Sequence, residues 1–596
     1  MFYAGELNIK EELKSEQRYQ LTILTLDDAV IKSYIRYDRG WKITINGRPV
    51  RVTKDGLFLS FTVPAGTNNV DVKYIPHILY LSTAISALGI ALVLLIYEAT
   101  KKHPTLKYYL IVAVIFLALR LPGLGSDVLN SDGARWHRRS ERFLQAIKTG
   151  DFAATYQHYQ PGVTLMWINS VTKKAVWEVQ DMFEMPRWSL ENAQDFPKIH
   201  AVSKSVLVII LSILLIYQMF LIAKISSLKT ALIYGLFVST EPYLVGIDRW
   251  FHLTSLESYF AFSAYLTYLY SLAHQSKVSI FATGALVALA TLSKLTGIIV
   301  LPLILLIEVI HAYCSKNIKR SIFSIALLVF GFSVGVFLLF PALWADLFNV
   351  VPKLFSAVVL AVDSDTRAQY FKPPFSYIYY LVILSFKLSP TILCVFVASL
   401  VLFVRRLKRT KEVARGRLIL AYFLTFLFVL TISTKKIDRY TLALVQPVLL
   451  FTSLYLAKLN KTSLGIIIAL QVLVSGFIYF RNFPVLSGYY SPLFGGVKTA
   501  LNMGVYENSG EYFAQSAFYL NSKGRADVYV PDNYESFKYF YQGNTLRDFS
   551  GSAKYVITSV DFDRKTPRII AGCEKLEKTF GPKGLIPLVF TYACTH

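Results

Sequence analysis

Long apolar runs recur along most of this chain of 596 residues. Each run is about 18–22 residues long, which is the length that a helix needs to cross the hydrocarbon core of a bilayer. A soluble chain of this length would need several domains, but here the hydrophobic residues, 54% of the total, gather in the runs. The sequence therefore predicts a polytopic α-helical membrane protein.

About twelve membrane helices are expected from these runs. They lie near 78–98, 106–121, 201–223, 230–247, 254–273, 278–293, 296–313, 321–342, 377–403, 418–434, 440–457 and 463–480.

The charge balance is strongly basic, with 62 Lys and Arg against 38 Asp and Glu and a net charge of +24. Most basic residues lie in short loops at helix ends, where they set topology, so we expect anionic lipids as partners and no nucleic acid. The clusters are Lys101-Lys102, Lys224 with Lys229, Lys277, Lys316 with Lys319-Arg320, Arg405 through Arg417, and Lys458 with Lys461.

These clusters fall at alternate connections between the expected helices, so the positive-inside rule places them in the cytoplasm. By parity, the N-terminal region, the 122–200 connection, the 343–376 loop and the C-terminal region face outward. The expected location is the plasma membrane, with the soluble domains extracytoplasmic.

The expected organisation has four parts. Residues 1–76 form a small β-sandwich-like domain, because strand-like alternation surrounds a hairpin turn at Asn46-Gly47. Residues 77–105 form a linking transmembrane helix, 106–480 the main membrane domain, and 481–596 an extracytoplasmic α/β domain. In that last part Tyr512 to Asn521 is predicted to be a helix, and 527–530 and 555–559 are predicted to be strands.

The four cysteines divide into two kinds. Cys314 and Cys394 lie in or beside apolar runs, as packing residues do. Cys573 and Cys594 share the polar C-terminal region and can form a disulfide if that region faces outside.

The polar stretch from Ser131 to Trp167 has the features expected of a functional loop. It reads SDGARWHRRSERFLQAIKTGDFAATYQHYQPGVTLMW and is too long for a plain linker. Its arginines at 135, 138, 139 and 142 share one face of a helix in the headgroup plane, and residues 163–179 are expected to form a second interfacial helix. An enzyme at a membrane surface needs such a segment, because a carboxylate can take a proton and cations can hold a phosphate.

Several segments, in order along the chain, resemble known membrane glycosyltransferases. They are RSERFLQAIKTGDFAATYQHYQPGVTLMW, EPYLVGIDRWFHLTSLESYFAF, TLSKLTGIIVLP, FSYIYYLVILSFKLSPTIL, KKIDRYTLALVQP and YYSPLFGGVKTALNMGVYENSGEYFAQSAFYLN. Together they resemble the bacterial branch of the protein O-mannosyltransferase-like family, over roughly residues 106–560. The N-terminal segment GWKITINGRPVRV…VPAGTNNVDVKY resembles the extracytoplasmic β domain of bacterial multi-pass glycosyltransferase-like membrane proteins.

This resemblance implies the GT-C fold and transfer of a sugar, hexose or mannose-like or pentose, from a polyprenyl-phosphate donor at the outer membrane face. The acceptor class, whether protein, lipid or polysaccharide, stays open. Three positions depart from the family pattern, which usually has Glu at Gly133, His at Gln160 and Asp at Thr254.

Asp132 is the first candidate for the catalytic carboxylate. It would accept the proton of the acceptor and stabilise an oxocarbenium-like transition state. The alternative is a helix N-cap, since Ser131-Asp132 precedes a helical pattern. Glu257 and Asp248 are further candidates for the carboxylate that the family has at Thr254.

The candidates for donor-phosphate binding are cations near helix ends on the expected outer face. Cations there run against the usual bias, and a bound phosphate would explain them, although snorkelling or local ion pairs would explain them too. The residues are Arg249, His252, Lys294, Lys435, Lys436 and Arg439.

Four further residues are candidates for the acceptor side or its loops: His137, Arg138, His158 and Asp365. A solvated or interfacial basic face is the alternative for each of them. No ligand set demands a metal, so no cofactor is required, although a divalent cation is compatible with the pattern.

Two other hypotheses about function stay open beside the glycosyltransferase. One is a transporter or flippase of lipid-linked sugars, which should show repeated halves and broken mid-membrane helices. The other is a non-catalytic GT-C relative that acts in envelope assembly, which the residues at Gly133, Gln160 and Thr254 would explain.

Overall fold

The computed structural model describes residues 2–3, 9–15, 18–37, 40–50, 52–75, 98, 100–363, 375–405, 411–565 and 572–595. Two compact units are present. One comprises Met1–Leu106 and Glu178–Arg187, and the other comprises Lys107–Trp177 and Trp188–His596. The candidate Asp365 lies outside the described residues. So does the helix expected at 78–98, except for its last residue, Glu98.

The N-terminal unit contains two antiparallel sheets. Apolar side chains alternate with polar ones along the strands, which buries one face of each sheet, and Leu21, Ile43, Phe61 and Val72 belong to the shared core. The hairpin predicted at Asn46-Gly47 is present, because both residues have positive φ, as a type I′ turn requires. One sheet has the order β1 (Phe2–Tyr3), β4 (Ala29–Arg36), β8 (Phe58–Val63), β7 (Thr53–Asp55), and the other β2 (Ile9–Ser15), β3 (Arg18–Thr25), β9 (Gly66–Tyr74), β5 (Trp41–Ile45), β6 (Arg48–Val50).

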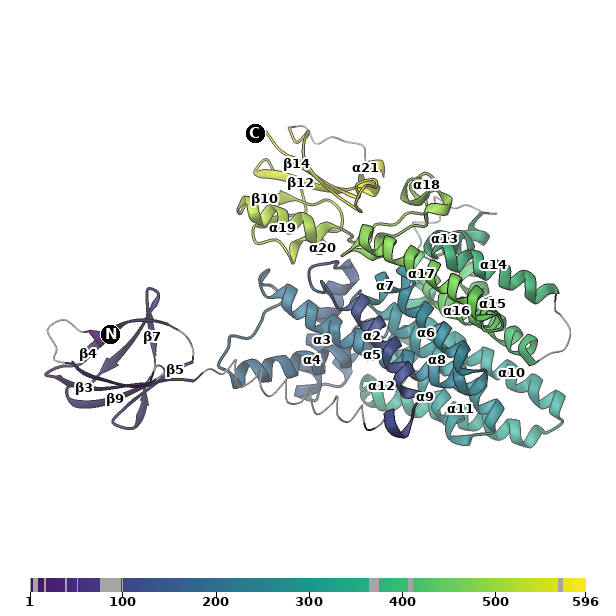
Figure 1. Ribbon diagram of the computed structural model, residues 1–596, viewed down its shortest axis with the longest axis horizontal. Helices are drawn as coiled ribbons and strands as arrows, with labels where there is room; N and C mark the ends of the chain where they lie inside the picture. The colour runs from purple at the N-terminus through teal and green to yellow at the C-terminus, as the bar shows by residue number, and fades with distance from the viewer. Residues whose placement is uncertain are drawn as a thin grey trace. The chain divides into compact units, whose positions relative to one another are not determined.

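The second unit is a helical bundle followed by an α/β part (Figure 1). Its α-helices are α2 (Leu106–Arg120), α3 (Ser131–Thr149), α4 (Val163–Met182), α5 (Phe196–Ile225), α6 (Leu228–Thr240), α7 (Pro242–Asp248), α8 (Leu253–His274), α9 (Lys277–Ser293), α10 (Val300–Ser315), α11 (Ile318–Leu339), α12 (Ala342–Asp363), α13 (Tyr379–Lys387), α14 (Pro390–Arg405), α15 (Lys411–Ile432), α16 (Leu442–Leu456), α17 (Lys461–Asn482), α18 (Gly496–Asn502), α19 (Phe513–Lys523), α20 (Tyr534–Lys538) and α21 (Val560–Lys565). Short 3-10 turns join them, among them η1 (Ala153–Thr155), η2 (Leu295–Ile299), η4 (Phe375–Ile378), η5 (Asp438–Thr441), η6 (Leu486–Gly488) and η7 (Pro492–Phe494).

The bundle has its apolar residues on the outside as well as the inside. Helix α16 is buried along its whole length, whereas α11 buries only Ser321, Ser324, Leu328 and Gly331 and exposes apolar side chains. A Cβ on Gly331 would collide with the backbone of α9, so the missing side chain lets these helices approach closely. Small residues inside and large apolar ones outside are the arrangement expected of helices that face lipid.

Five helices among the described residues are long and apolar enough to cross a membrane, or six if a bent pair counts as one span. The count of about twelve is not confirmed. The expected span 230–247 is broken at Glu241-Pro242 into α6 and α7, which bend by 65°, and 377–403 is split before Pro390 into α13 and α14. In both cases the proline lacks the N–H that would continue the preceding helix.

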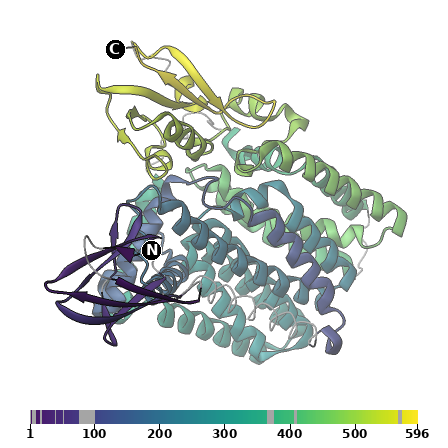
Figure 2. The ribbon, with the colours of Figure 1, turned by 60° about the vertical axis from the view of Figure 1, so that its left-hand side comes forward.

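The C-terminal α/β part lies at one end of the bundle in both views (Figures 1 and 2). Its sheet has the order β11 (Asn544–Leu546), β10 (Asp527–Tyr529), β12 (Ala553–Ser559), β14 (Val589–Ala593), β13 (Lys575–Phe580). The predicted helix and strands are therefore present as α19, β10 and β12, and Cys573 is disulfide-bonded to Cys594. The amide of Gln515 donates to the carbonyls of Ser126 and Asp127, which holds this part against the loop before α3.

Candidate functional site

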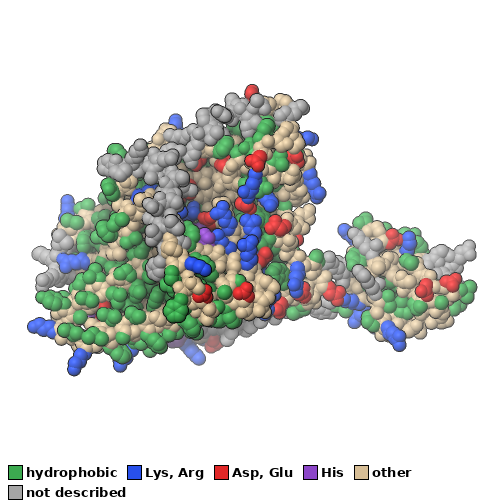
Figure 3. Space-filling model, turned by 180° about the vertical axis from the view of Figure 1, so that it is seen from behind, with side chains coloured by type: hydrophobic (Ala, Val, Ile, Leu, Met, Phe, Trp, Pro, Cys, Tyr) green, Lys and Arg blue, Asp and Glu red, His purple; other side chains and the backbone are tan. Residues whose placement is uncertain are grey.

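A cavity of about 440 Å³ lies where the loops at one end of the bundle meet the α/β part. In Figure 3, basic side chains and a histidine gather in a hollow of the surface, with hydrophobic side chains covering the face beside it. The lining residues are predominantly polar and come from segments far apart in the sequence. They are Asn130, Ser131, Asp132, Arg135, Trp136, Arg139, His158, Tyr159, Gln160, His252, Leu253, Lys294, Lys435, Ile437, Arg439, Tyr440, Glu507, Asn508, Ser509 and Asn533.

The first turn of α3 brings Asp132 to this cavity. Asn130, not Ser131 or Asp132, caps the helix, because its side-chain oxygen accepts from the backbone N–H of Asp132 at 2.9 Å. The Asp132 carboxylate is therefore free for other contacts, and the helix N-terminus favours its negative charge. The N-cap alternative for this residue is excluded.

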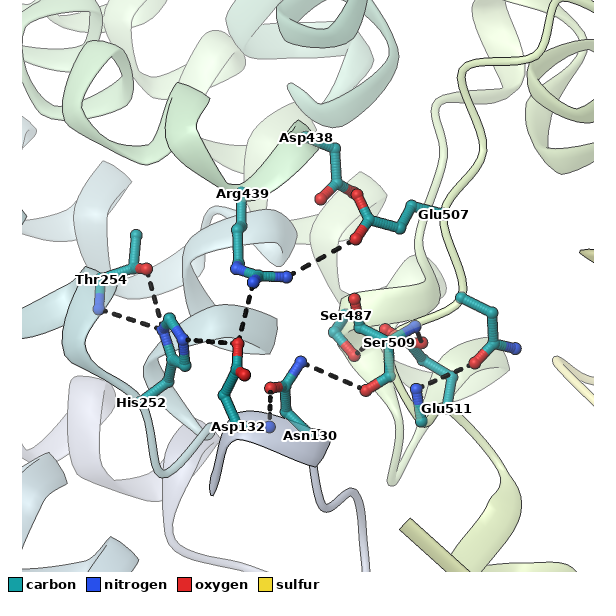
Figure 4. A network of polar contacts seen from close by, with 12 residues as sticks. Asn130, Asp132, His252, Thr254, Asp438, Arg439, Ser487, Glu507, Ser509 and Glu511 are labelled. Atoms are coloured by element: carbon teal, nitrogen blue, oxygen red, sulfur yellow. Dashed lines mark hydrogen bonds and ion pairs between the residues drawn. The ribbon is translucent and has the colours of Figure 1, made fainter. Parts of the chain in front are cut away.

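Three basic residues surround the Asp132 carboxylate, and Figure 4 shows two of them, Arg439 and His252. The Arg439 Nη2 atom lies 3.0 Å from Oδ2, the Arg135 Nη1 atom lies 3.4 Å from Oδ1, and the His252 Nε2 atom lies 3.6 Å from Oδ2. Burial by itself would raise the pKa of Asp132, but His252, Arg439 and Arg135 outweigh it and hold that pKa well below its usual range. The side chain keeps 31% of its exposure, so an ionised carboxylate faces the cavity.

His252 is held as a neutral donor toward Asp132. The Thr254 backbone N–H donates to Nδ1 at 3.3 Å, and the Thr254 hydroxyl lies 2.9 Å from the same nitrogen. The ring proton therefore belongs on Nε2, which faces Asp132. Burial, only partly offset by Asp132, lowers the pKa of His252 to about 4, so the contact at neutral pH is polar and not an ion pair. Thr254, one of the departures from the family pattern, thus sets the histidine tautomer.

Arg439 lies between two carboxylates. Besides Asp132, it approaches Glu507, whose Oε1 atom is 3.6 Å from Nη1. Burial would lower the pKa of Arg439, but Asp132 and Glu507 together raise it. Its neighbour Asp438 is buried and paired with Lys387 at 3.2 Å, which anchors η5 beneath the cavity.

Lys294 reaches the cavity at the junction of α9 and η2. Its Nζ atom lies 3.4 Å from Glu257 Oε2 and 3.6 Å from the ring centroid of Tyr440. Glu257 also accepts from the Thr296 hydroxyl and is not among the lining residues. Glu257, which the sequence made a catalytic candidate, therefore holds Lys294 in position.

The adjacent lysines Lys435 and Lys436 have different surroundings. Lys435 lines the cavity. Lys436 is buried and donates to the carbonyls of Leu430 and Thr431 at 3.1 and 2.6 Å. Only Lys435 is therefore placed to meet a ligand there.

Two candidates from the second expected loop lie away from the cavity. Asp248 is completely buried and bonded to Arg120, whose Nε atom is 2.9 Å from Oδ2. Arg249 is also buried, 3.0 Å from Asp127 Oδ2, and donates to the carbonyls of Arg120 and Pro122. Asp248 and Arg249 therefore connect helix ends to one another. Their charges, which made them candidates for chemistry, are paired with Arg120 and Asp127.

The acceptor-side candidates are divided in the same way. His158 lines the cavity, and burial, followed by the charge of Arg139, lowers its pKa to about 4. His137 lies on the buried face of α3, and its Nε2 atom is 2.9 Å from the Nδ1 atom of His200. Arg138 donates to the Tyr539 hydroxyl at 2.8 Å and so contacts the α/β part and not the cavity.

The other departures from the family pattern have structural explanations. A Cβ on Gly133 would lie 3.0 Å from the Phe251 carbonyl oxygen, so a glutamate there would displace the chain that carries His252. Gln160 lines the cavity, and its side-chain oxygen accepts from the Leu295 N–H at 3.2 Å, which holds the Lys294 turn.

Glu507 and Ser509 were missed by sequence reasoning. They follow α18 in a short polar run, YENSGE, that carries no recognisable chemical motif. The only signal was a glutamate in a loop expected on the same side as Asp132. Among the described residues, no group of three or more His, Cys, Asp or Glu could hold a metal ion.

Comparisons with known proteins give limited likenesses. A family model described as "Bacterial membrane protein YfhO" matches residues 8–86, and a search of curated protein sequences finds no match. The Archaeoglobus fulgidus oligosaccharyltransferase in its apo form is 12% identical with a TM-score of 0.41, over 78% of this chain and 70% of that one. ArnT from Cupriavidus metallidurans bound to undecaprenyl phosphate is 11% identical with a TM-score of 0.43, over 82% and 97%.

Similarity at this level assigns neither a fold nor an activity to the chain. The YfhO match covers the N-terminal strands and ends well before the cavity.

Proposed function

We propose that this chain is a membrane glycosyltransferase that moves a sugar from a polyprenyl-phosphate donor to an acceptor on the outer face of the plasma membrane. The observation that carries the proposal is an ionised carboxylate, Asp132, in a cavity whose charged lining is mostly cationic. Two carboxylates, Asp132 and Glu507, face five cations: Arg135, Arg139, Lys294, Lys435 and Arg439.

The surplus of positive charge suits a phosphate. Arginine binds phosphate through paired N–H donors, and lysine binds it as a point charge. Both histidines of the lining are neutral at pH 7, since their pKa values are about 4. Recognition of the anion thus depends on Arg and Lys and not on protonation of the histidines.

The same cations favour departure of the phosphate. As the bond between the sugar anomeric carbon and the phosphate oxygen breaks, the electron pair leaves with polyprenyl phosphate, and negative charge grows on that oxygen. Fixed cations stabilise this charge in the transition state more than in the ground state, which lowers the barrier.

Asp132 acts on the acceptor. Its carboxylate accepts the proton of the acceptor hydroxyl while the acceptor oxygen forms the new bond to the anomeric carbon. In the unliganded cavity Arg439 and Arg135 make Asp132 a weak base. An incoming phosphate competes for those cations, which raises the proton affinity of Asp132 when the donor is in place.

The finer assignments follow from the sequence. The family resemblance favours a hexose, mannose-like sugar or a pentose, with a protein, lipid or polysaccharide of the cell envelope as acceptor. The alternating basic clusters support an extracytoplasmic position of the cavity and of the α/β part.

The test is transfer by the purified full chain from a panel of labelled polyprenyl-phosphate sugars. Lys435→Gln and Lys436→Gln form a matched pair, since the first residue lines the cavity and the second is bonded to backbone carbonyls. We expect Lys435→Gln to raise the KM for the donor by about tenfold, the usual worth of one charge-assisted contact. Folded Lys436→Gln should keep the wild-type KM.

No transfer from any donor of the panel by the wild type would overturn the proposal. An equal KM for the donor in the wild type and in Lys435→Gln would contradict the placement of the donor phosphate in this cavity.

A further inference from the structure

A second cavity, which we call the α17 groove, lies at the end of α17 that adjoins the α/β part. Its volume is about 910 Å³. Figure 1 shows α17 at the side of the bundle with its C-terminal end near α18 and the α/β part. The groove is lined by Pro390, Leu473, Val474, Phe477, Ile478, Arg481, Asn482, Gly488, Tyr489, Tyr490, Pro492, Gly495, Gly496, Val497, Lys498, Gly584, Leu585 and Ile586.

One wall of the groove is continuous with a lipid-facing surface. Helix α17 is among the helices that are long and apolar enough to cross a membrane. Its residues Leu473 and Phe477 are 71% and 60% exposed, and Leu585 on the opposite wall is 48% exposed. An acyl chain can therefore enter the groove sideways from the bilayer.

The charged residues that line the groove are cations. Among the described residues, its lining contains Arg481 and Lys498 and no Asp or Glu. Arg481 donates from Nε to the Lys583 carbonyl at 3.1 Å and from Nη2 to the Gly584 carbonyl at 3.0 Å. These bonds fix the guanidinium and use two of its five N–H donors, while the exposed Lys498 adds a second cation. A snorkelling arginine alone would explain neither the second cation nor the fixed geometry.

We propose that the α17 groove binds one bilayer phospholipid with an anionic headgroup. The acyl chains lie against Leu473, Phe477 and Leu585, and the headgroup phosphate meets Arg481 and Lys498. Apolar walls open to the bilayer and two cations in the lining are complementary to such a lipid.

The groove is connected to the Asp132 cavity through Tyr490. Tyr490 lines the groove, and its hydroxyl lies 3.5 Å from Asp438 Oδ2 and 3.4 Å from the backbone nitrogen of Glu507. Glu507 pairs with Arg439, and Asp438 precedes Arg439 in η5. The bound lipid therefore supports the wall behind Arg439, and it stabilises the folded chain as any ligand of the native state does.

The site is tested with photoactivatable phosphatidylglycerol on the full chain in neutral detergent, and labelled residues are mapped by mass spectrometry. We expect residues 473–478 and 584–586 to be labelled. Unlabelled phosphatidylglycerol should compete with this labelling at concentrations about tenfold lower than those at which phosphatidylcholine does. Lys498→Glu should weaken the labelling about tenfold. The matched control is Lys461→Glu, at the other end of α17, which should leave these segments labelled.

Val474→Trp, which fills the groove without changing its charge, should abolish labelling of both segments. Because Lys498 is exposed, its substitution leaves the fold intact, so unchanged labelling in Lys498→Glu would overturn the proposal. Equal displacement by phosphatidylcholine would also overturn it. Stronger displacement by polyprenyl phosphate would identify a carrier lipid as the occupant and would contradict the assignment to a phospholipid. None of these readouts depends on sugar transfer.

Discussion

Two aspartate–arginine pairs in this protein have nearly the same geometry and different surroundings. Asp132 and Arg439 are 3.0 Å apart at the cavity, and Asp248 and Arg120 are 2.9 Å apart inside the bundle. The Asp132 side chain is 31% exposed, whereas both members of the inner pair are completely buried.

The remaining partners explain the difference. Asp248 also accepts from the hydroxyls of Ser255 and Tyr259 at 2.8 and 3.0 Å, so protein donors satisfy both oxygens. Asp132 has cations on one side and an open cavity on the other. An ion pair thus indicates a reactive site only when a ligand can reach it, and otherwise it holds helices together.

The largest expected effect is that one aspartate affects mainly turnover and the other mainly stability. Asp132→Asn should lower the turnover number by about 10²–10⁴-fold, the usual contribution of general acid–base catalysis, and it should cost less stability than Asp248→Asn because Glu507 still pairs with Arg439. Asp248→Asn should lower the free energy of unfolding by about 3–5 kcal/mol, because Arg120 would stay buried without a negative partner. Transfer assays and denaturant unfolding of both variants measure the contrast, and a loss of stability that is larger in Asp132→Asn would remove the distinction.

A second, smaller effect concerns pH. In the unfolded chain His252 titrates near 6.5, but in the folded chain its pKa is about 4. The unfolded state therefore binds more protons between these values, so stability should rise with pH from about 4 to 6.5. The depressed pKa of Asp132 adds a slope of the same sign only at the acid end of this range, since its stabilisation is lost progressively as pH falls below about 5.

Replacing His252 by Gln should make the curve of unfolding midpoint against pH flatter over this range. The part of the slope that is lost would belong to His252, whereas His158, whose pKa is also about 4, would keep its own share. Parallel curves for the wild type and His252→Gln would contradict the assignment.

The smallest effect is expected at Gly133, beneath the Asp132 pair. Gly133→Ala places a Cβ 3.0 Å from the Phe251 carbonyl and should cost about 1–3 kcal/mol of stability, as overpacking does. The matched change Gly465→Ala, where no atom lies within 4 Å, should not destabilise the protein. Equal stability of the two variants would show that the contact with Phe251 relaxes freely.

Much of the architecture could be predicted from local patterns. Alternation and the Asn46-Gly47 turn predict the N-terminal strands, since both depend on neighbouring residues alone. The number of spans could not be predicted, because mean hydropathy over a run does not show where the folded chain breaks it, as at 230–247 and 377–403.

For the site, sequence reasoning placed Asp132, His252, Lys294, Lys435 and Arg439 in one region, and the structure brings all five to the cavity. It could not separate Asp248 and Arg249 from them, because their partners Arg120 and Asp127 lie more than a hundred residues away in the chain. Glu507 was missed for the same reason, since only the folded chain brings it to Arg439.

The most direct measurement of the central claim is binding of a polyprenyl phosphate, compared with the matching polyprenol, to the full chain. Wild type should bind the phosphate at least tenfold more tightly than the alcohol, and Arg439→Gln should lose most of that preference, because one of the cations that hold the phosphate is gone. Equal binding of phosphate and alcohol by the wild type would contradict a phosphate site beside Asp132.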